Sequence, residues 1–260
     1  MIFRWFEHRQ IYHPHRVLET QASGLGRPFE DVRFKTSDHL TLHGWFFPAD
    51  AHSARAKSAM LVCHGNTGNI GDRLDFCAAL LETGVSVFLF DYRGFGNSQG
   101  RPSEEGTYLD AQAAYGWLRQ KEFSPDRIIA FGESLGGGIA SELARRERLA
   151  GIVLQNTFCS IPEVGAELYP WLPIKWISTI KYDTCSRLPE LHLPVLVMHS
   201  RGDAYIRFHH AQKNFACANH PKMFWEIAGK HGDPLADRVS FVKGMEKFLE
   251  LVESVGELKR

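Results

Sequence analysis

Short apolar runs alternate along the chain with longer segments in which apolar residues recur at helical spacing. Runs of this length are typical of strands that are buried on both faces of a parallel sheet. The alternation predicts an α/β fold, in which a mostly parallel central sheet carries helices on both faces. We expect strands at 59–63, 85–90, 128–131, 151–155, 195–199 and 223–227, and helices at about 71–83, 103–120, 207–218 and 235–252, with a further helix starting near Leu135.

Two regions depart from this alternation. Residues 29–35 and 40–47 alternate between polar and apolar positions on either side of a short polar turn, which predicts an antiparallel hairpin at a sheet edge. Residues 156–191 contain no clear strand but many aromatic residues and prolines, so we expect a small cap over one end of the sheet. We therefore predict a single domain over 1–260, with a cap insertion at 156–191.

Composition narrows the classes of partner and cofactor. The chain carries 30 Lys and Arg against 30 Asp and Glu, with no basic run, so we expect no nucleic acid partner. Five cysteines without a close pair in the sequence predict reduced thiols and a cytoplasmic protein. Thirteen histidines occur without H-E-x-x-H or C-x-x-C, and adjacent His209 and His210 should point in different directions on a helix. We predict no metal site and no cofactor.

The chain shows no apolar stretch of the roughly 20 residues needed to cross a bilayer, and no signal peptide. Its first residues nevertheless mix aromatic and basic side chains. Two interpretations stay open: this segment contacts a membrane surface peripherally, or it packs against its own domain. The residues concerned are Ile2, Phe3, Trp5 and Phe6, among Arg4, His8 and Arg9.

Gly132-x-Ser134-x-Gly136 follows a predicted buried strand and precedes a predicted helix. This context is typical of a nucleophile elbow, in which the serine is held in a strained turn above the strand end. Glycines suit the flanking positions because a side chain there would strike the neighbouring strand or helix. A hydroxyl becomes a good nucleophile only when a base accepts its proton. Ser134 is therefore a candidate nucleophile that requires a base and an acid elsewhere.

The last two predicted strands supply candidates for both partners. His231 follows the final strand and is the candidate base, and Asp203 follows the preceding strand and is the candidate acid. Asp233 is a rival acid, but it is too close in sequence to His231 to reach back to its ring. Residues 155 and 156 occupy another acid position, but they are Gln and Asn and carry no charge. The order Ser, Asp, His is characteristic of one fold.

The oxyanion of an acyl-transfer reaction requires two N–H donors. We expect them from the main chain of Leu135, at the elbow, and of Asn66, in the loop after the first parallel strand. Asp91 and Arg93 are interpreted as structural, because their turn supplies both signs of charge and a buried charge needs a partner. Three aromatic residues of the predicted cap are candidates to line a substrate pocket, namely Phe158, Trp171 and Trp176.

Taken as a set, several motifs resemble those of α/β-hydrolase-fold serine hydrolases, and most closely the group that contains α/β-hydrolase domain-containing proteins thirteen and seventeen and their bacterial relatives. The resemblance implies hydrolysis of esters or thioesters and, in some relatives, removal of long acyl chains from protein cysteines. The sequence lacks the membrane-spanning N-terminal helix of many members and the N-terminal cysteine cluster of the depalmitoylating branch, which argues against a membrane-bound depalmitoylase. The motifs are His64-Gly65-Asn66-Thr67-Gly68-Asn69-Ile70-Gly71, Asp91-Tyr92-Arg93-Gly94-Phe95-Gly96, Ser103-Glu104-Glu105-Gly106, the Ser134 elbow and Asn156-Thr157-Phe158.

Together these patterns predict a serine hydrolase that cleaves the ester or thioester bond of a small apolar acyl substrate through an acyl-enzyme on Ser134. Two alternatives stay open. One is a peptidase or amidase that uses the same three residues, and the other is a ligand-binding module on a hydrolase scaffold. The sequence gives no prediction of the oligomeric state.

Overall fold

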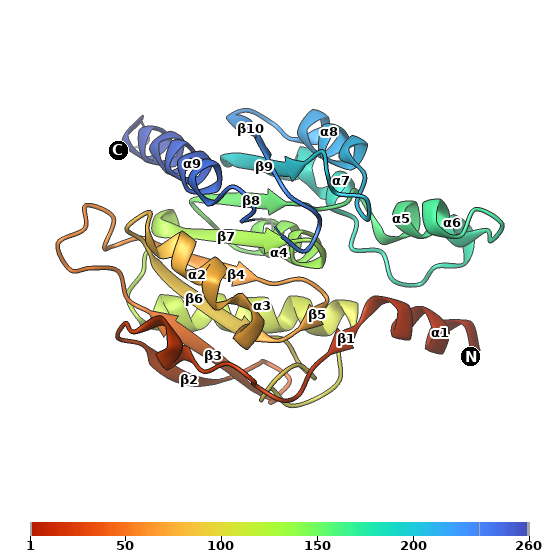
Figure 1. Cartoon of the computed structure of the whole chain (residues 1–260), viewed down its shortest axis with the longest axis horizontal. Helices are drawn as coiled ribbons and strands as arrows, with labels where there is room; N and C mark the ends of the chain where they lie inside the picture. Colours follow the sequence, from red (N-terminus) through yellow and green to blue (C-terminus); the bar gives the residue numbers. More distant parts are fainter. Residues whose placement is uncertain (1, 234, 259–260) are drawn as a thin grey trace.

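A computed structural model describes residues 2–233 and 235–258. Within these residues one eight-stranded sheet runs through the molecule in the order β10-β9-β8-β7-β4-β6-β3-β2 (Figure 1). The six strands β6, β4, β7, β8, β9 and β10 are parallel to one another. Strand β3 pairs antiparallel with β6 and with β2. The strands are β2 (Glu30–Lys35), β3 (Thr41–Phe47), β4 (Ala59–Cys63), β6 (Ser86–Asp91), β7 (Ile128–Glu133), β8 (Gly151–Gln155), β9 (Val195–Ser200) and β10 (Lys222–Ile227).

Helices cover both faces of this sheet. On one face lie α2 (Leu74–Leu81) and α9 (Arg238–Leu258), and on the other lie α3 (Glu104–Gln120), α4 (Leu135–Arg146) and α8 (Phe208–Cys217) (Figure 1). The predicted α/β class, its mostly parallel sheet and the antiparallel hairpin are therefore confirmed. The predicted helix at 71–83 begins instead with a 3₁₀ turn, Ile70–Arg73, because the Asn69 side chain caps that turn.

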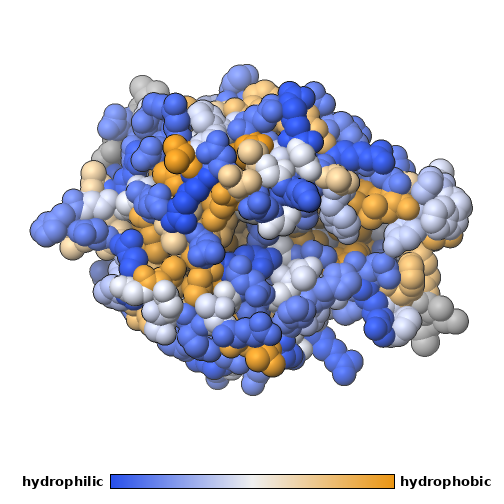
Figure 2. All heavy atoms as spheres, in the orientation of Figure 1, coloured by the Kyte–Doolittle hydropathy of each residue, from blue (hydrophilic) through white to orange (hydrophobic). Residues whose placement is uncertain are grey.

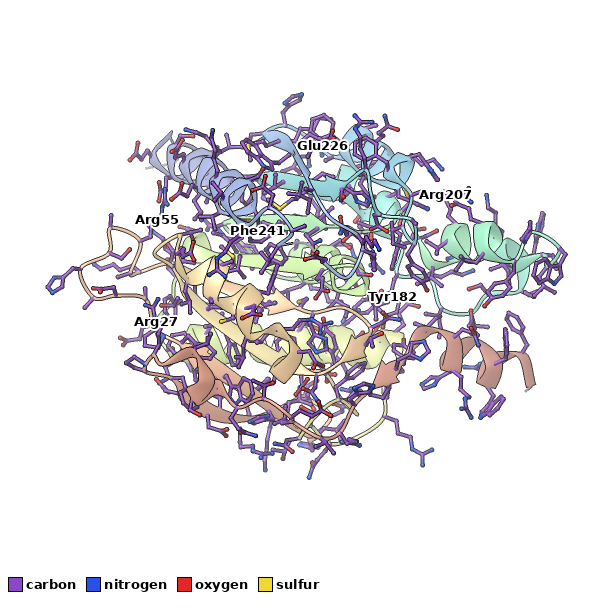
Figure 3. The ribbon with its side chains drawn as sticks, viewed as in Figure 1. Arg27, Arg55, Tyr182, Arg207, Glu226 and Phe241 are labelled. Atoms are coloured by element: carbon purple, nitrogen blue, oxygen red, sulfur yellow. The ribbon has the colours of Figure 1, made fainter. Side chains whose placement is uncertain are left out.

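Each strand of the parallel core contributes to two apolar layers. In β4, Leu61 belongs to the layer under α3, α4 and α8, while Met60 and Val62 belong to the layer under α2 and α9. This division follows from the two-residue period of a strand. Phe241 of α9 fills the second layer, with its ring centroid 6.3 Å from that of Phe131 in β7 (Figure 3). The resulting core fixes the strand ends from which the site is built.

Residues 156–191 are all described and contain no strand, as expected of the cap. They form α5 (Ile161–Leu168), α6 (Ile174–Ile177), α7 (Thr184–Arg187) and a 3₁₀ turn, Leu188–Glu190. The helices α5 and α6 project beyond the carboxyl ends of the strands, next to α1 (Ile2–Ile11) (Figure 1). Sequence analysis did not predict α1 as a helix. It also missed the small parallel pair formed by β1 (His13–Pro14) and β5 (Thr67–Gly68).

The described helices include none with both the length and the apolar character needed to cross a membrane.

Candidate active site

Ser134 lies at the sharp turn between β7 and α4. Its backbone has a φ of 52° and a ψ of −113°, a strained conformation that a non-glycine residue rarely adopts. A Cβ atom at Gly136 would overlap the main-chain carbonyl of Cys63, and one at Gly132 would overlap Gly137. The sequence thus needs glycine on both sides of the serine, and the turn holds the Ser134 side chain beyond the end of β7.

Two hydrogen bonds connect Ser134 to the loops after the last two strands. The Nε2 atom of His231 lies 3.0 Å from Ser134 Oγ, and its Nδ1 atom lies 2.6 Å from Asp203 Oδ2. The other carboxylate oxygen of Asp203 accepts the main-chain N–H groups of Tyr205 (2.9 Å) and Ile206 (2.8 Å). The Asp203 carboxylate is therefore buried and held in place. When His231 Nδ1 donates its hydrogen to this carboxylate, the Nε2 atom of the neutral ring can accept a proton from Ser134.

The structure therefore brings together the three residues that the sequence predicts as nucleophile, base and acid. Asp233, the rival acid, forms no ion pair or hydrogen bond with His231 among the described side chains, and its N–H donates to Lys230 O within the same loop.

The two predicted oxyanion donors lie at the start of α4 and in the loop that follows β4. Leu135 begins α4, so its N–H has no intrahelical acceptor and points outward at the positive end of the helix dipole. Asn66 lies between β4 and β5, and its carbonyl accepts the His13 N–H (2.9 Å) while its side chain donates to Ile11 O (2.6 Å). Within the described chain neither main-chain N–H donates a hydrogen bond, which leaves both available to an oxyanion.

An ion pair that sequence analysis missed fixes the peptides around Asn66. Glu133 accepts the Gly65 N–H (3.2 Å) and the Arg73 Nε–H (2.9 Å), and Arg73 Nη2 donates to Thr67 O (3.0 Å). Burial opposes ionisation of Glu133, but Arg73 and the Gly65 N–H outweigh this cost and hold its pKa below the usual value. Because the residues before and after Asn66 are both held, the direction of its N–H is fixed. We call Glu133 and Arg73 the loop clamp.

Asn156 is a second positioning residue that sequence analysis did not identify. It follows β8 with a φ of 46°, and its side chain accepts the Ser200 N–H (3.1 Å) and donates to His231 O (3.5 Å). Ser200 Oγ in turn accepts the Gly202 N–H (3.0 Å) and donates to Gly229 O. These contacts join the loops that carry Asp203 and His231. The position of Asn156 at a strand end and its place in the Asn156-Thr157-Phe158 motif were the available signals, but sequence analysis gave this residue no positioning role.

Sequence analysis interprets Asp91 and Arg93 as structural residues whose opposite charges meet, but the structure gives each of them other partners. Arg93 does not pair with Asp91: it donates to Asp110 Oδ1 (2.9 Å) and Asp38 Oδ2 (2.8 Å). Asp91 is fully buried, and its Oδ1 accepts the Ile70 N–H (3.0 Å). Burial raises the pKa of Asp110 to about 6, with Arg93 opposing this shift. A turn with both signs of charge does not imply that the two charges meet.

The predicted pocket residues lie in quite different surroundings. Phe158 is buried in the apolar core, but Trp171 is 73% exposed and Trp176 is 89% exposed. A side chain that lines an enclosed acyl pocket would be largely shielded from solvent. The structure thus corrects the prediction for the two tryptophans, whose rings lie on the outer surface of the cap. Aromatic content indicated a cap but did not tell which way its rings point.

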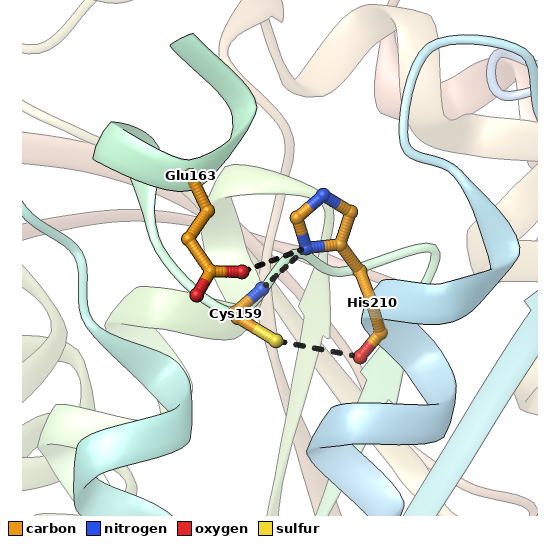
Figure 4. Close-up of side chains that lie close together, drawn as sticks. All are labelled: Cys159, Glu163 and His210. Atoms are coloured by element: carbon orange, nitrogen blue, oxygen red, sulfur yellow. Dashed lines mark hydrogen bonds and ion pairs between the residues drawn. The ribbon is translucent and has the colours of Figure 1, made fainter. Parts of the chain in front are cut away.

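A group of polar residues joins the cap helix α5 to α8. Figure 4 shows His210 Nδ1, which accepts the Cys159 N–H (3.3 Å) and lies 3.9 Å from Glu163 of α5. The His210 Nε2 atom lies 3.3 Å from Glu167, which also contacts His209 Nε2 (2.8 Å). The two imidazoles stack with centroids 4.4 Å apart, which corrects the expectation that they point in different directions. Burial lowers the pKa of His210 to about 4. A neutral, hydrogen-bonded His210 acts here as a structural contact that holds α5 in place.

Comparison with known proteins agrees with this architecture. Residues 58–179 match the family model of the alpha/beta hydrolase fold, and the chain is 30% identical to the alpha/beta hydrolase domain-containing protein WAV2 of Arabidopsis thaliana, over 73% of this chain and 67% of that protein. The chain therefore belongs to the alpha/beta hydrolase fold family.

The matches to individual relatives cover most of the chain. The uncharacterized protein Rv2307c of Mycobacterium tuberculosis is 38% identical over 99% of this chain and 92% of its own length. Among solved structures, the Pyrococcus furiosus esterase Pf2001 has a TM-score of 0.75 at 21% identity, and the match covers 93% of this chain and 97% of that one. At that identity the structural match shows the fold alone.

Proposed function

We propose that this chain is a serine hydrolase that cleaves carboxylic ester or thioester bonds of apolar acyl substrates through an acyl-enzyme on Ser134. The observation that carries the proposal is the continuous hydrogen-bonded path from Ser134 Oγ through His231 to Asp203. The main-chain N–H groups of Asn66, in the loop after β4, and of Leu135, at the start of α4, donate no hydrogen bond within the described chain. Nucleophile, base, orienting acid and oxyanion donors are the parts that acyl transfer requires.

The acylation step uses these parts in sequence. His231 Nε2 accepts the Ser134 proton as Oγ attacks the acyl carbonyl carbon, and the carbonyl π electrons move onto oxygen. The N–H groups of Asn66 and Leu135 donate to this oxyanion, and Asp203 stabilises the imidazolium that forms. When the tetrahedral intermediate collapses, the bond to the alcohol or thiol breaks and His231 gives its proton to that leaving group. The acyl group remains as an ester on Ser134.

Deacylation repeats the same steps with water as the nucleophile. His231 removes a proton from water, hydroxide adds to the acyl carbonyl, and Ser134 leaves with the proton returned by His231. The products are a carboxylic acid and the regenerated enzyme. No cofactor takes part in either half-reaction.

Two further observations support this class of substrate. The Pyrococcus furiosus protein Pf2001, which has a similar fold, is an esterase, and the sequence motifs resemble the group of α/β-hydrolase domain-containing proteins thirteen and seventeen. The many aromatic residues of 156–191, among them the buried Phe158, favour an apolar acyl group over a charged one.

A fluorophosphonate probe tests the proposal. It should label the wild-type protein on the peptide that contains Ser134 and leave Ser134→Ala unlabelled, as read by mass spectrometry. A series of p-nitrophenyl esters, acyl thioesters and anilides of equal chain length then defines the bond that is cleaved. Turnover of anilides above esters would replace the esterase proposal with an amidase. If the wild-type protein is folded but is neither labelled nor active on any of these substrates, the chain is a binding module instead.

A further inference from the structure

The helix α1 and the cap helices α5 and α6 form one projecting unit beyond the strand ends (Figure 1). The carboxylate of Glu7 in α1 accepts the hydroxyls of Ser178 and Thr179 at 2.6 Å each, directly after α6. The Tyr169 hydroxyl donates to Gln10 Oε1 (3.1 Å). A buried carboxylate that is satisfied by hydroxyl and N–H donors holds the two segments in a fixed relation. The first and the middle parts of the chain thus present one common surface.

Exposed apolar side chains gather on this unit. Trp5 is 62% exposed, and with the two cap tryptophans it forms a set of three exposed indoles. The other tryptophans of the chain, Trp45, Trp117 and Trp225, are buried or partly buried in the core. Figure 2 shows apolar surface on the right-hand side, the end at which α1, α5 and α6 lie in Figure 1. We define the apolar tip as Trp5, Phe6, Leu168, Trp171, Trp176 and Ile177.

The carboxylates of this unit are all occupied by partners. Glu7 is engaged by the hydroxyls after α6. Glu163 pairs with Lys213 at 2.9 Å, and Glu167 contacts His209 at 2.8 Å, so both face α8 rather than the tip. Hydrogen bonds or ion pairs therefore engage each carboxylate of the unit, and those of α5 face α8.

The cations of the unit are left facing solvent. Arg4, Arg9 and Lys175 are exposed, and no described carboxylate pairs with any of them. The Arg9 guanidinium lies 4.9 Å from the centroid of the Trp5 ring. The surface therefore combines exposed indoles with unpaired positive charge.

We propose that the apolar tip and these three cations dock onto an anionic phospholipid bilayer. Tryptophan is the residue that favours the boundary between headgroups and acyl chains, since its ring is apolar and its N–H is polar. Cations beside it gain energy from anionic headgroups. A protein partner with an acidic apolar groove is the alternative occupant. Exposed indoles beside unpaired Arg and Lys side chains are the combination that suits the interface of an anionic bilayer.

Docking in this way brings the candidate active site to the membrane. The carbonyl of Ile11, at the end of α1, accepts a hydrogen bond from the Asn66 side chain in the loop that carries the proposed oxyanion donor. The half-exposed ring of Tyr205 lies 5.3 Å from that of His231. The tip and the strand ends that carry Ser134 and His231 thus lie at the same end of the molecule, and a docked protein presents this end to the acyl chains of the bilayer. Docking itself does not depend on catalysis.

Vesicle binding tests the proposal. We expect the full chain to co-sediment with vesicles of equal parts phosphatidylcholine and phosphatidylglycerol, and brominated acyl chains to quench its tryptophan fluorescence. The double variant Trp171→Ala and Trp176→Ala should lower the partition coefficient by about tenfold or more, since each indole removes a large apolar area from water. Each of Arg4→Gln, Arg9→Gln and Lys175→Gln should lower it about fivefold on anionic vesicles and have little effect on pure phosphatidylcholine.

Two controls make the result decisive. Val239→Ala changes an exposed apolar residue at the start of α9, away from the unit, and should bind like the wild type. Ser134→Ala should also bind, so a failure of the catalytic proposal leaves this test intact. If the folded double tryptophan variant binds vesicles as well as the wild type does, the proposal is wrong. It is also wrong if the wild type ignores vesicles and instead forms a dimer that the double variant cannot form.

Discussion

The candidate active site and the apolar tip treat side chains in opposite ways. At the site, the carboxylates that hold the catalytic loops are buried and hydrogen-bonded. Asp203 accepts two main-chain N–H groups and the N–H of the His231 ring, and Glu133 accepts N–H groups of Arg73 and Gly65. At the tip, large apolar rings such as Trp171 and Trp176 are exposed, and the Glu7 carboxylate of the same unit is hydrogen-bonded within the protein. Each arrangement is costly for folding alone, which is why each points to a function.

The difference shows what each region is built to contact. Buried polar groups are expensive unless their geometry is fixed, so a site that contains them is organised before substrate arrives. Exposed indoles keep apolar area in water, and that cost is recovered only when another apolar phase covers them. The proposed function gives the site a small reacting group as its ligand, and the docking proposal gives the tip an extended apolar surface.

Removing the nucleophile should separate the two regions most clearly. Ser134→Ala deletes one oxygen at a turn, so the protein should fold and its tip should be unchanged. Its kcat on a short ester should fall by about a million-fold, the scale for loss of a triad serine. Steady-state hydrolysis of p-nitrophenyl acetate measures this, and esterase activity close to that of the wild type would rule out Ser134 as the nucleophile.

The acid should give the next largest effect. Asp203→Asn turns the acceptor of the His231 proton into an amide and favours the wrong tautomer of the imidazole, so kcat should fall about ten-thousand-fold. Asp233→Asn is the matched control, because it makes the same change two residues after His231. It should lower kcat far less than Asp203→Asn does. A larger loss in the control than in Asp203→Asn would move the role of acid to Asp233.

Breaking the loop clamp should weaken catalysis because the Asn66 N–H is no longer held in position. Arg73→Ala frees Thr67 O and Glu133, so the Asn66 N–H loses its fixed direction. The kcat should fall by about ten- to a hundred-fold with KM little changed, less than the 10²–10³ seen when an oxyanion donor is removed outright. Steady-state kinetics of the folded variant gives the split between kcat and KM.

Arg55→Ala is a closely matched control for this clamp. Arg55 also pairs with a carboxylate, Glu253, and donates to a main-chain carbonyl, Thr83 O, but at the far end of the molecule (Figure 3). It should lower stability without a comparable fall in kcat. Equal losses of kcat in the two variants would mean that Arg73 acts only on stability.

The smallest effect concerns pH and stability. Arg73 holds the pKa of Glu133 below its usual value, so the ionised pair stabilises the fold above that value and this contribution is lost as the pH falls through the lowered pKa. Glu133→Gln lacks this dependence. The Tm of the wild type should exceed that of Glu133→Gln by a few degrees at neutral pH, and the gap should close in acid. Thermal melts between pH 3 and 7 measure it, and a gap independent of pH would contradict the linkage.

The sequence predicted the regions that periodicity controls. Parallel strands place their carboxyl ends together, so residues that follow them, such as Asp203 and His231, were brought to Ser134 by topology alone. Periodicity does not reveal which side chains meet across 60 residues, so the pairing of Arg73 with Glu133 was missed and Arg93 was given the wrong partner. Periodicity also does not show which way side chains point in an irregular segment such as 156–191, where Trp171 and Trp176 are exposed.

Trapping the acyl-enzyme tests the central claim most directly. The wild-type protein is mixed with p-nitrophenyl butyrate, quenched in acid within the first turnover, digested and examined by mass spectrometry. The account predicts a butyryl group on the peptide that contains Ser134, formed together with a burst of p-nitrophenol and absent in Ser134→Ala. Steady hydrolysis with no acylated Ser134 at any quench time, and an equal rate in Ser134→Ala, would contradict it.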